Sequence, residues 1–305
     1  MANLSVKFCD VTFENPTVLA SGILGVTASS LKNVVRNGAG GVTTKSIWLT
    51  EHIGHKNPTM FGTESYFLNA VGLSDAGIEK AKEETFPEYN KDKPAPIIAN
   101  IVAYSMDDFE KLTQEITTCD PDIIEVNISC PNVDDKYGKP FSCVAAQANK
   151  VTALVRENTD KPIVIKLTPN VPNIVEIAEA CKEAGADGFC LINTLSGMGI
   201  DIDLRMPILT NKSGGVSGPA IKPIAVKAVH DVYKATKMPI IGTGGITTGE
   251  DAIEIMMAGA TLVGVGTMVY YRGIEGFAEM VKEMDDWCDK NGVKNLDEII
   301  GVAVK

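Results

Sequence analysis

The 305-residue sequence lacks any long apolar run, and no window approaches the roughly 18 consecutive apolar residues of a membrane span. Its first ten residues also lack the basic region and apolar stretch of a signal peptide. Lysine and arginine form no stripe, and 39 acidic residues outweigh 28 basic ones, which gives a formal net charge of -11. We therefore expect a cytoplasmic protein without a membrane or nucleic-acid partner.

Paired cysteines are lacking as well. The chain has seven cysteines, and no two of them form a Cys-x-x-Cys motif. An odd count without such a motif suits neither a disulfide framework nor a zinc or iron–sulfur site. His52 and His55 are three residues apart, but a pair without a third ligand is more typical of a loop than of a metal site. We therefore predict no metal centre.

What the sequence has is a regular alternation of short β-branched runs with stretches of helical spacing. The eight runs are residues 17–20, 41–44, 96–99, 123–126, 163–166, 188–192, 239–242 and 261–265. Most show no polar alternation, as expected of strands buried on both faces of a parallel sheet. Eight such units predict one α/β domain, a (β/α)8 TIM barrel that spans residues 1–305. The alternative is a doubly wound open sheet, but no Gly-x-Gly-x-x-Gly follows the first run.

The length beyond a minimal barrel falls in identifiable segments. Residues 4–8 and 11–13 alternate in hydrophobicity around Cys9 and Asp10, which predicts an N-terminal β-hairpin that closes the bottom of the barrel. Longer gaps separate the second and third, fourth and fifth, and sixth and seventh strands. Insertions in a barrel usually build the rim of the active site, so we expect these three gaps to do so.

Polar residues follow five of the predicted strands at equivalent positions. They are Lys45, Asn100, Asn127, Lys166 and Asn193. Any one of them could be a solvated loop residue, but the C-terminal ends of barrel strands form the functional face, so five together indicate a site. Strands seven and eight instead end in the glycine turns 242–245 and 264–267. These are either tight turns that need positive φ or, as we prefer, a backbone cradle for a terminal phosphate.

The segment after the fourth strand contains a candidate catalytic thiol. Pro131 restricts Cys130 to an extended conformation, and Asn127 and Asn132 offer amides on either side. A lone cysteine is more often a buried apolar side chain, but its place between two asparagines favours a base or a nucleophile. Because the pKa of a free thiol is about 8.5, such a role needs a nearby cation or hydrogen bonds.

These motifs together resemble the class 1 dihydroorotate dehydrogenases, FMN-dependent barrel enzymes of pyrimidine (UMP) biosynthesis, and class 1B catalytic subunits more than class 1A. The matching segments run from end to end: 20–22, 44–46, 69–73, 127–132, 166–170, 192–195, 214–223 and the two glycine turns. The resemblance implies that Cys130 removes the C5 proton of dihydroorotate while hydride leaves C6 for FMN N5, which gives orotate. The loop 133–140 is polar, as a lid would be, but departs from the glycine-rich class 1B form.

The resemblance also implies a set of binding residues. The substrate would contact Lys45, Asn69, Val71, Gly72, Leu73, Asn127, Asn132, Asn193 and Thr194. FMN would contact Ala20, Ser21, Gly22, Lys45, Ser46, Asn100, Asn127, Lys166, Ile192, Ser217, Gly218, Gly244, Gly245, Gly266 and Thr267. Lys166 would lie near the N1–C2 edge of the flavin, where a positive charge stabilises the anionic reduced ring.

The implied partners are a second copy of the chain and an electron-transfer subunit with FAD and an iron–sulfur cluster, in a heterotetramer that passes electrons to NAD. The class 1A alternative is a chain that is reoxidised by fumarate. An FMN barrel acting on another dihydropyrimidine would have His in place of Asn132, and a tRNA dihydrouridine synthase is disfavoured by the acidic charge. A non-catalytic phosphate-binding barrel could lose Cys130 or Lys45, and both are present.

Overall fold

A closed barrel of eight parallel strands forms the centre of the computed structural model, which describes residues 2–129 and 141–305. The strands follow the order β10-β15-β16-β3-β4-β7-β8-β9 around the barrel. Their bounds are β3 (Thr17–Leu19), β4 (Gly41–Thr43), β7 (Ile97–Ile101), β8 (Ile123–Asn127), β9 (Ile163–Leu167), β10 (Gly188–Leu191), β15 (Ile240–Thr243) and β16 (Leu262–Val265). The closure confirms the predicted TIM barrel and excludes the doubly wound sheet.

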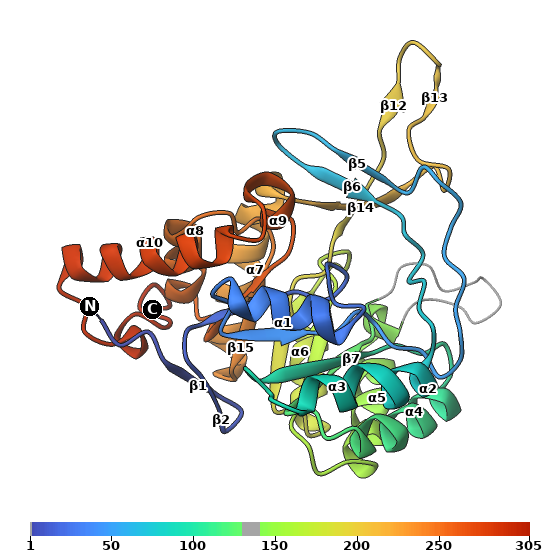
Figure 1. The fold of residues 1–305 in the computed structure, drawn as a ribbon, viewed down its shortest axis with the longest axis horizontal. Coiled ribbons are helices and arrows are strands. Elements are labelled where there is room, and N and C mark those ends of the chain that lie inside the picture. The colour runs from blue at the N-terminus through green and yellow to red at the C-terminus, as the bar shows by residue number, and fades with distance from the viewer. Residues whose placement is uncertain (1, 130–140) are drawn as a thin grey trace.

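Helices surround the barrel, as Figure 1 shows. Their bounds are α1 (Ala28–Arg36), α2 (Ile78–Lys80), α3 (Phe86–Asn90), α4 (Met106–Thr118), α5 (Ala145–Glu157), α6 (Ile174–Glu183), α7 (Lys222–Thr236), α8 (Gly249–Met257), α9 (Met268–Arg272) and α10 (Gly276–Asn291), with a π-helical turn at Ala81–Thr85 and 3-10 turns at Phe141–Cys143, Pro219–Ile221 and Leu296–Glu298. In α4 the buried positions recur at i, i+3, i+4 and i+7 from Phe109, which gives one apolar face toward the barrel. The Ser105 side chain caps this helix by accepting from the N–H of Asp108. No helix in residues 2–129 or 141–305 is long and apolar enough to cross a membrane.

The predicted hairpin closes the N-terminal end of the barrel. It consists of β1 (Val6–Phe8) and β2 (Val11–Phe13), with Val6 paired to Phe13. The rings of Phe8 and Phe13 are fully buried. The Phe13 ring packs so closely on the first residue of β4 that a Cβ added at Gly41 would lie 2.5 Å from it. Apolar side chains of the hairpin therefore pack against this end of the barrel.

The excursions at the other end build a second, antiparallel sheet. It contains β5 (Met60–Gly62), β6 (Phe67–Asn69), β11 (Leu195–Gly197) and β14 (Gly214–Ser217), in the order β11-β14-β6-β5. Two of its strands come from the second-to-third gap and two from the sixth-to-seventh gap, so it joins segments about 150 residues apart along the chain, as in the pair Asn69 and Gly215. A further hairpin of β12 (Ile200–Asp201) and β13 (Met206–Pro207) projects beyond this sheet (Figure 1). The rim prediction is confirmed for these two gaps.

Candidate active site

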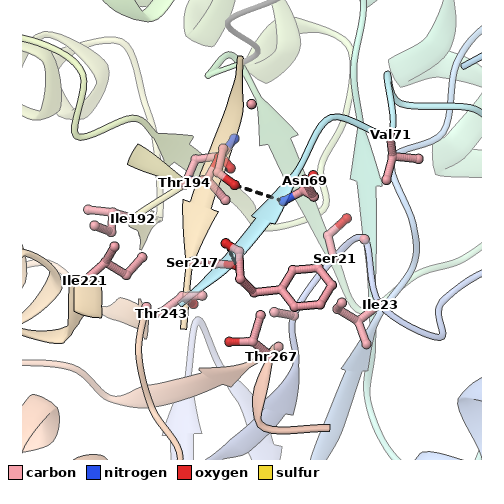
Figure 2. Close-up of a pocket in the computed structure, with 18 of the residues that line it drawn as sticks. Ser21, Ile23, Asn69, Val71, Ile192, Thr194, Ser217, Ile221, Thr243 and Thr267 are labelled. Carbon is pink, nitrogen blue, oxygen red and sulfur yellow. Dashed lines mark hydrogen bonds between the residues drawn. The ribbon is translucent and has the colours of Figure 1, made fainter. Parts of the chain in front are cut away.

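A cavity of about 360 Å³ lies at the C-terminal ends of the barrel strands, roofed by the antiparallel sheet. Its size is that of a site for a small molecule or cofactor. Figure 2 shows side chains from barrel strands and from β6 and β14 converging on it. The predicted site residues that line it are Ala20, Ser21, Gly22, Lys45, Ser46, Asn69, Val71, Gly72, Leu73, Asn127, Lys166, Ile192, Asn193, Thr194, Ser217, Gly244, Gly245, Gly266 and Thr267.

Four predicted site residues stand apart from this lining. Asn100 is fully buried but does not border the cavity, and Gly218 follows the lining residue Ser217 without itself bordering the cavity. Cys130 and Asn132 lie outside the described residues, as does the predicted lid loop 133–140. The catalytic thiol therefore remains a prediction of the sequence.

The ends of three barrel strands are tied together by a chain of amides and hydroxyls. The Ser129 hydroxyl donates to Asn127 Oδ1 at 2.7 Å, and Asn193 Nδ2 donates to Ser129 Oγ at 2.6 Å. Asn127 Nδ2 in turn donates to Ser46 Oγ at 3.4 Å. Because a backbone N–H can only donate, the Ser129 N–H on Asn127 Oδ1 and the Thr194 N–H on Asn193 Oδ1 fix which end of each amide is oxygen. Asn127 and Asn193 thus present oriented amides to the cavity.

A buried ion pair lies at the floor of the cavity. Lys166 Nζ is 3.3 Å from Glu125 Oε1, and the two side chains are 8% and 2% exposed. Asn100 Nδ2 donates to the same carboxylate oxygen. Burial lowers the pKa of the Lys166 amine, but the neighbouring Glu125 carboxylate, with a smaller effect of Cys190, more than offsets this, so the pKa lies above its usual value. The cavity floor therefore carries a protonated amine.

The segment from Asn69 to Asp75 forms one wall and is fixed by aromatic side chains. Trp48 Nε1 donates to the carbonyl of Leu73 at 2.9 Å, and His55 Nδ1 donates to that of Ala70 at 3.0 Å. The His52 ring stacks on Trp48 with centroids 4.5 Å apart. The two histidines thus support this wall, and no group of three His, Cys, Asp or Glu side chains able to hold a metal occurs in the described part of the chain.

A second amine lies at the edge of this wall. Lys45 Nζ donates to Ser74 Oγ at 2.9 Å. Burial lowers the pKa of the Lys45 amine, and the opposing effect of Asp75 does not cancel the shift. An anionic group in the cavity would raise this pKa again, because an opposite charge favours the protonated form. Lys45 is therefore suited to pair with a carboxylate.

The glycine turns after β15 and β16 bring bare backbone to the opposite side of the cavity. Gly245 has φ of +76°, and an added Cβ would lie 2.6 Å from the backbone nitrogen of Lys222. The Lys222 amine is already paired with Asp251 and Glu254, each at 2.7 Å. Anion binding at these turns would therefore depend on the backbone N–H groups of the turns themselves, which suits a phosphate.

Two buried polar atoms near the cavity have no partner within the described residues, Ser21 Oγ and Asn100 Oδ1. A buried hydroxyl or amide oxygen without a hydrogen bond costs free energy, so such atoms usually have a partner. Ser21 lines the cavity, where a polar ligand would satisfy it. The oriented amides, the amine at the floor and the glycine turns together fit a flat heterocycle that carries a phosphate.

The sequence-based prediction missed part of the lining. The additional residues are Ile23, Met60, Phe67, Ala70, Asn170, Ser196, Ser213, Gly214, Gly215, Ile221 and Ile246, whereas the lining residues Thr243 and Gly264 belong to the predicted glycine turns. Asn170 links two loops, because its Nδ2 donates to the Thr194 carbonyl at 3.0 Å and its Oδ1 accepts from the Ser196 N–H at 2.9 Å. Asn170 could have been found from the sequence, because it is a polar residue shortly after the fifth predicted strand. Met60 and Phe67 gave no such signal, because they reach the cavity only through the antiparallel sheet.

Comparisons with known proteins agree with this geometry. A family model described as dihydroorotate dehydrogenase matches residues 3–287. The chain is 44% identical over 303 residues to the protein "Dihydroorotate dehydrogenase B (NAD(+)), catalytic subunit" of Methanocaldococcus jannaschii, with 98% of each chain covered. It is 40% identical to proteins of the same name from Methanothermobacter thermautotrophicus, with 98% of each chain covered, and Pyrococcus abyssi, with 99% covered. The chain therefore belongs to the dihydroorotate dehydrogenase family, a family of FMN-dependent oxidoreductases.

Proposed function

We propose that this chain oxidises dihydroorotate to orotate in pyrimidine biosynthesis, with FMN bound in the cavity at the C-terminal end of the barrel. The observation that carries the proposal is the convergence of oriented amides, two lysines and two glycine turns on one cavity. The family to which the chain belongs and the names of its relatives favour the same reaction.

FMN would be held by the glycine turns on one side of the cavity and by the residues at its floor. Its phosphate would bind the backbone of Gly244, Gly245, Gly266 and Thr267, and its ring would lie over Lys166. The other contacts proposed from sequence are Ala20, Ser21, Gly22, Lys45, Ser46, Asn100, Asn127, Ile192, Ser217 and Gly218. When bound, FMN would supply the acceptor for the C6 hydride of the substrate. Lys166 would place its positive charge near the N1–C2 edge of the ring.

The substrate would bind between the oriented amides and the Asn69–Asp75 wall. Lys45 would pair with the substrate carboxylate, while Asn127 and Asn193 would hydrogen-bond the ring amides, since each offers both a donor and an acceptor. The remaining contacts proposed from sequence are Asn69, Val71, Gly72, Leu73, Asn132 and Thr194. This arrangement would fix the substrate ring and leave its reacting carbons free.

Cys130 is our proposed base. Its place in Asn-Ile-Ser-Cys-Pro-Asn supports a thiol at the mouth of the site, next to Asn127 and Ser129. The Cys130 thiolate would take the C5 proton as the C6–H bond breaks, and would return that proton to solvent after orotate leaves. A base of this kind works best when its pKa lies near the operating pH.

We further propose a homodimer that joins an FAD and iron–sulfur subunit and passes electrons to NAD in the cytoplasm. The printed names of the relatives, NAD-linked catalytic subunits, support the NAD route. The β12–β13 hairpin supports assembly, because Ile202 and Leu204 at its tip are 82% and 69% exposed. Residues 1–305 would form one domain, since the N-terminal segment pairs with the C-terminal one through Asn3 and Lys294.

Anaerobic visible spectra of the purified chain, before and after addition of dihydroorotate, test the proposal. We expect a yellow protein whose flavin bands bleach with dihydroorotate, because the reductive half-reaction needs no partner subunit. Reoxidation by NAD with the partner, or by fumarate without it, then separates the class 1B and class 1A routes. A colourless chain that takes up no FMN would contradict the proposal, and a yellow chain that stays oxidised would move the substrate to another dihydropyrimidine.

A further inference from the structure

Glu125 is a buried carboxylate that belongs to neither proposed binding set. It lies on β8 two residues before Asn127, so both side chains point into the barrel and Glu125 lies one layer below the cavity. Glu125 does not border the cavity, whereas Lys166 does. The Glu125 carboxylate therefore reaches a cavity ligand only through its neighbours.

Both neighbours of Glu125 are groups proposed to hold FMN. Its Oε1 accepts from Lys166 Nζ at 3.3 Å and also from Asn100 Nδ2. The contact with Asn100 turns the amide so that Oδ1 faces away from the carboxylate, and this oxygen has no partner among the described residues. One carboxylate oxygen thus holds the orientation of both side chains.

Stability alone gives little reason for this arrangement. Burying an ion pair costs desolvation energy on both sides, and apolar residues of similar size are often as stable or more so. The neighbouring barrel residues Ile98, Ile123 and Val164, of which Val164 pairs with Glu125, are fully buried and apolar, so an apolar layer was available here. A buried carboxylate beside a cavity lysine is therefore better explained by its effect on that lysine.

We propose that Glu125 is a positioning residue that keeps the Lys166 amine protonated and directed at the cavity, and so makes FMN binding independent of pH in the neutral and mildly alkaline range. The inference rests on the proposed function, since it assumes that FMN binds over Lys166.

The groups that face Lys166 are few. Glu125 approaches from β8 and Cys190 from β10, and burial raises the pKa of the Cys190 thiol far above its usual value, so Cys190 stays neutral. Glu125 therefore supplies the one negative charge among these groups that counters the cost of burying the amine. Without that charge, burial would lower the pKa of Lys166 below its usual value.

The consequence can be measured as an FMN affinity. If FMN prefers the protonated amine, its dissociation constant rises by up to about tenfold for each pH unit above the pKa of Lys166, until it reaches the value for the neutral amine. In the native protein this pKa lies above the usual lysine value, so the affinity should change less than about twofold between about pH 7.5 and about pH 9, a range above the second pKa of a phosphate monoester. In Glu125→Gln this rise should begin within that range.

The experiment compares three proteins by FMN fluorescence quenching across this range: native, Glu125→Gln, and the double variant Glu125→Gln with Lys166→Met. We expect a flat profile for the native protein, a sloping one for Glu125→Gln, and a flat but weaker one for the double variant, which lacks the titrating amine. The double variant buries no charge at this pair, so it should fold at least as well as the single one. If Glu125→Gln does not fold, Glu125→Asp replaces it, because the shorter carboxylate withdraws from Nζ and should give a slope at higher pH.

A flat profile in a folded Glu125→Gln or Glu125→Asp variant would overturn the inference while leaving the proposed function intact. A slope that persists in the double variant would also overturn it, because the titrating group would not be Lys166. A native protein that binds no FMN at any pH would instead contradict the proposed function, and the inference with it.

Discussion

The two ends of the barrel are built from opposite kinds of residue. At the N-terminal end, the Phe8 and Phe13 rings of the hairpin are fully buried and meet the glycines that begin β4 and β10. At the C-terminal end, the strands finish in Lys45, Asn127, Lys166 and Asn193, and a cavity remains between them. One end is filled by apolar packing, and the other is kept open by polar groups.

This difference indicates that residues at one end of the barrel contribute mainly to stability, whereas residues at the other end serve binding and catalysis. Apolar side chains at the closed end contribute free energy of folding without meeting a ligand. Polar groups at the open end hydrogen-bond one another, as in the Asn193–Ser129–Asn127 chain, and Asn127 and Asn193 also line the cavity, where they can contact a ligand. Changes at the closed end should alter stability alone, and changes at the open end should alter binding or turnover first.

The largest effect is expected for Cys130→Ala, a change at the open end. The variant should retain FMN, while turnover of dihydroorotate falls by a factor of about 10²–10⁴, because the proposed general base is lost. Steady-state rates and the flavin absorbance of the same sample measure both quantities. Cys143→Ala, a partly buried cysteine further along the chain, is the control and should keep full turnover. Unchanged turnover in Cys130→Ala would remove Cys130 from the base role.

At the closed end, Phe13→Ala should lower the free energy of unfolding by about 3–5 kcal/mol, since it removes a fully buried ring and leaves a cavity in its place. Urea denaturation measures this loss. Phe13→Leu should cost less, because it refills part of the space. FMN affinity of the folded variant should match that of the native protein, and a weakened affinity would break the proposed separation of the two ends.

Asn193→Ala should weaken orotate binding by a factor of about ten to one hundred, since it removes an oriented amide and leaves Ser129 with one partner fewer. Titration of the flavin spectrum with orotate measures the dissociation constant. The free energy of unfolding should change less than in Phe13→Ala. An orotate affinity equal to that of the native protein would place the substrate elsewhere in the cavity.

The smallest effect is expected for Asp251→Asn. Asp251 lies at the open end but does not line the cavity, so this variant tests whether a residue there can affect stability alone. Asp251 accepts from the N–H groups of Thr247 and Thr248 and pairs with Lys222. Burial alone would raise the pKa of this carboxyl, but the contacts with Lys222 and Thr247 lower it overall. Its contribution is therefore present above the usual carboxyl pKa and is lost as pH falls through the lowered value. The variant should be less stable by about 1 kcal/mol at neutral pH, with the gap closing in acid during denaturant titrations.

A gap between native protein and Asp251→Asn that is constant with pH would contradict this account, because a neutral side chain would then serve equally well. Thr248→Ala is the matched control. It removes the other half of the reciprocal cap of α8 without removing a charge, so its cost should not vary with pH in the acid range.

The sequence predicted the barrel well because its evidence is local. Each strand is a short β-branched run, and the residue after it lies at the functional end whatever the rest of the chain does. Lys45, Asn127, Lys166 and Asn193 were found in this way, and all four line the cavity. Asn100 follows the same rule but is turned toward Glu125, which a strand-end rule cannot foresee.

The roof of the cavity could not be predicted in the same way. Phe67 belongs to β6, which pairs with β14 about 150 residues later, and Met60 belongs to β5, which joins the same sheet by pairing with β6. No local pattern encodes that register, because the partner strand is glycine-rich and lacks a hydrophobic alternation. The role of Glu125 was hidden for a similar reason, since one buried acid in an apolar run gives no indication of its neighbours.

By itself, the sequence determined the eight-fold alternation, the closing hairpin, the polar strand ends and the family resemblance, because each depends on residue type and spacing along the chain. The tertiary structure alone decided which strands of the rim pair, which amide ends face the cavity, and that Lys166 shares a carboxylate with Asn100. The physical reason is distance along the chain. The periodicity of the sequence determines whether a residue lies in a strand, a helix or a loop, whereas contacts between elements remote in sequence arise only when the barrel closes.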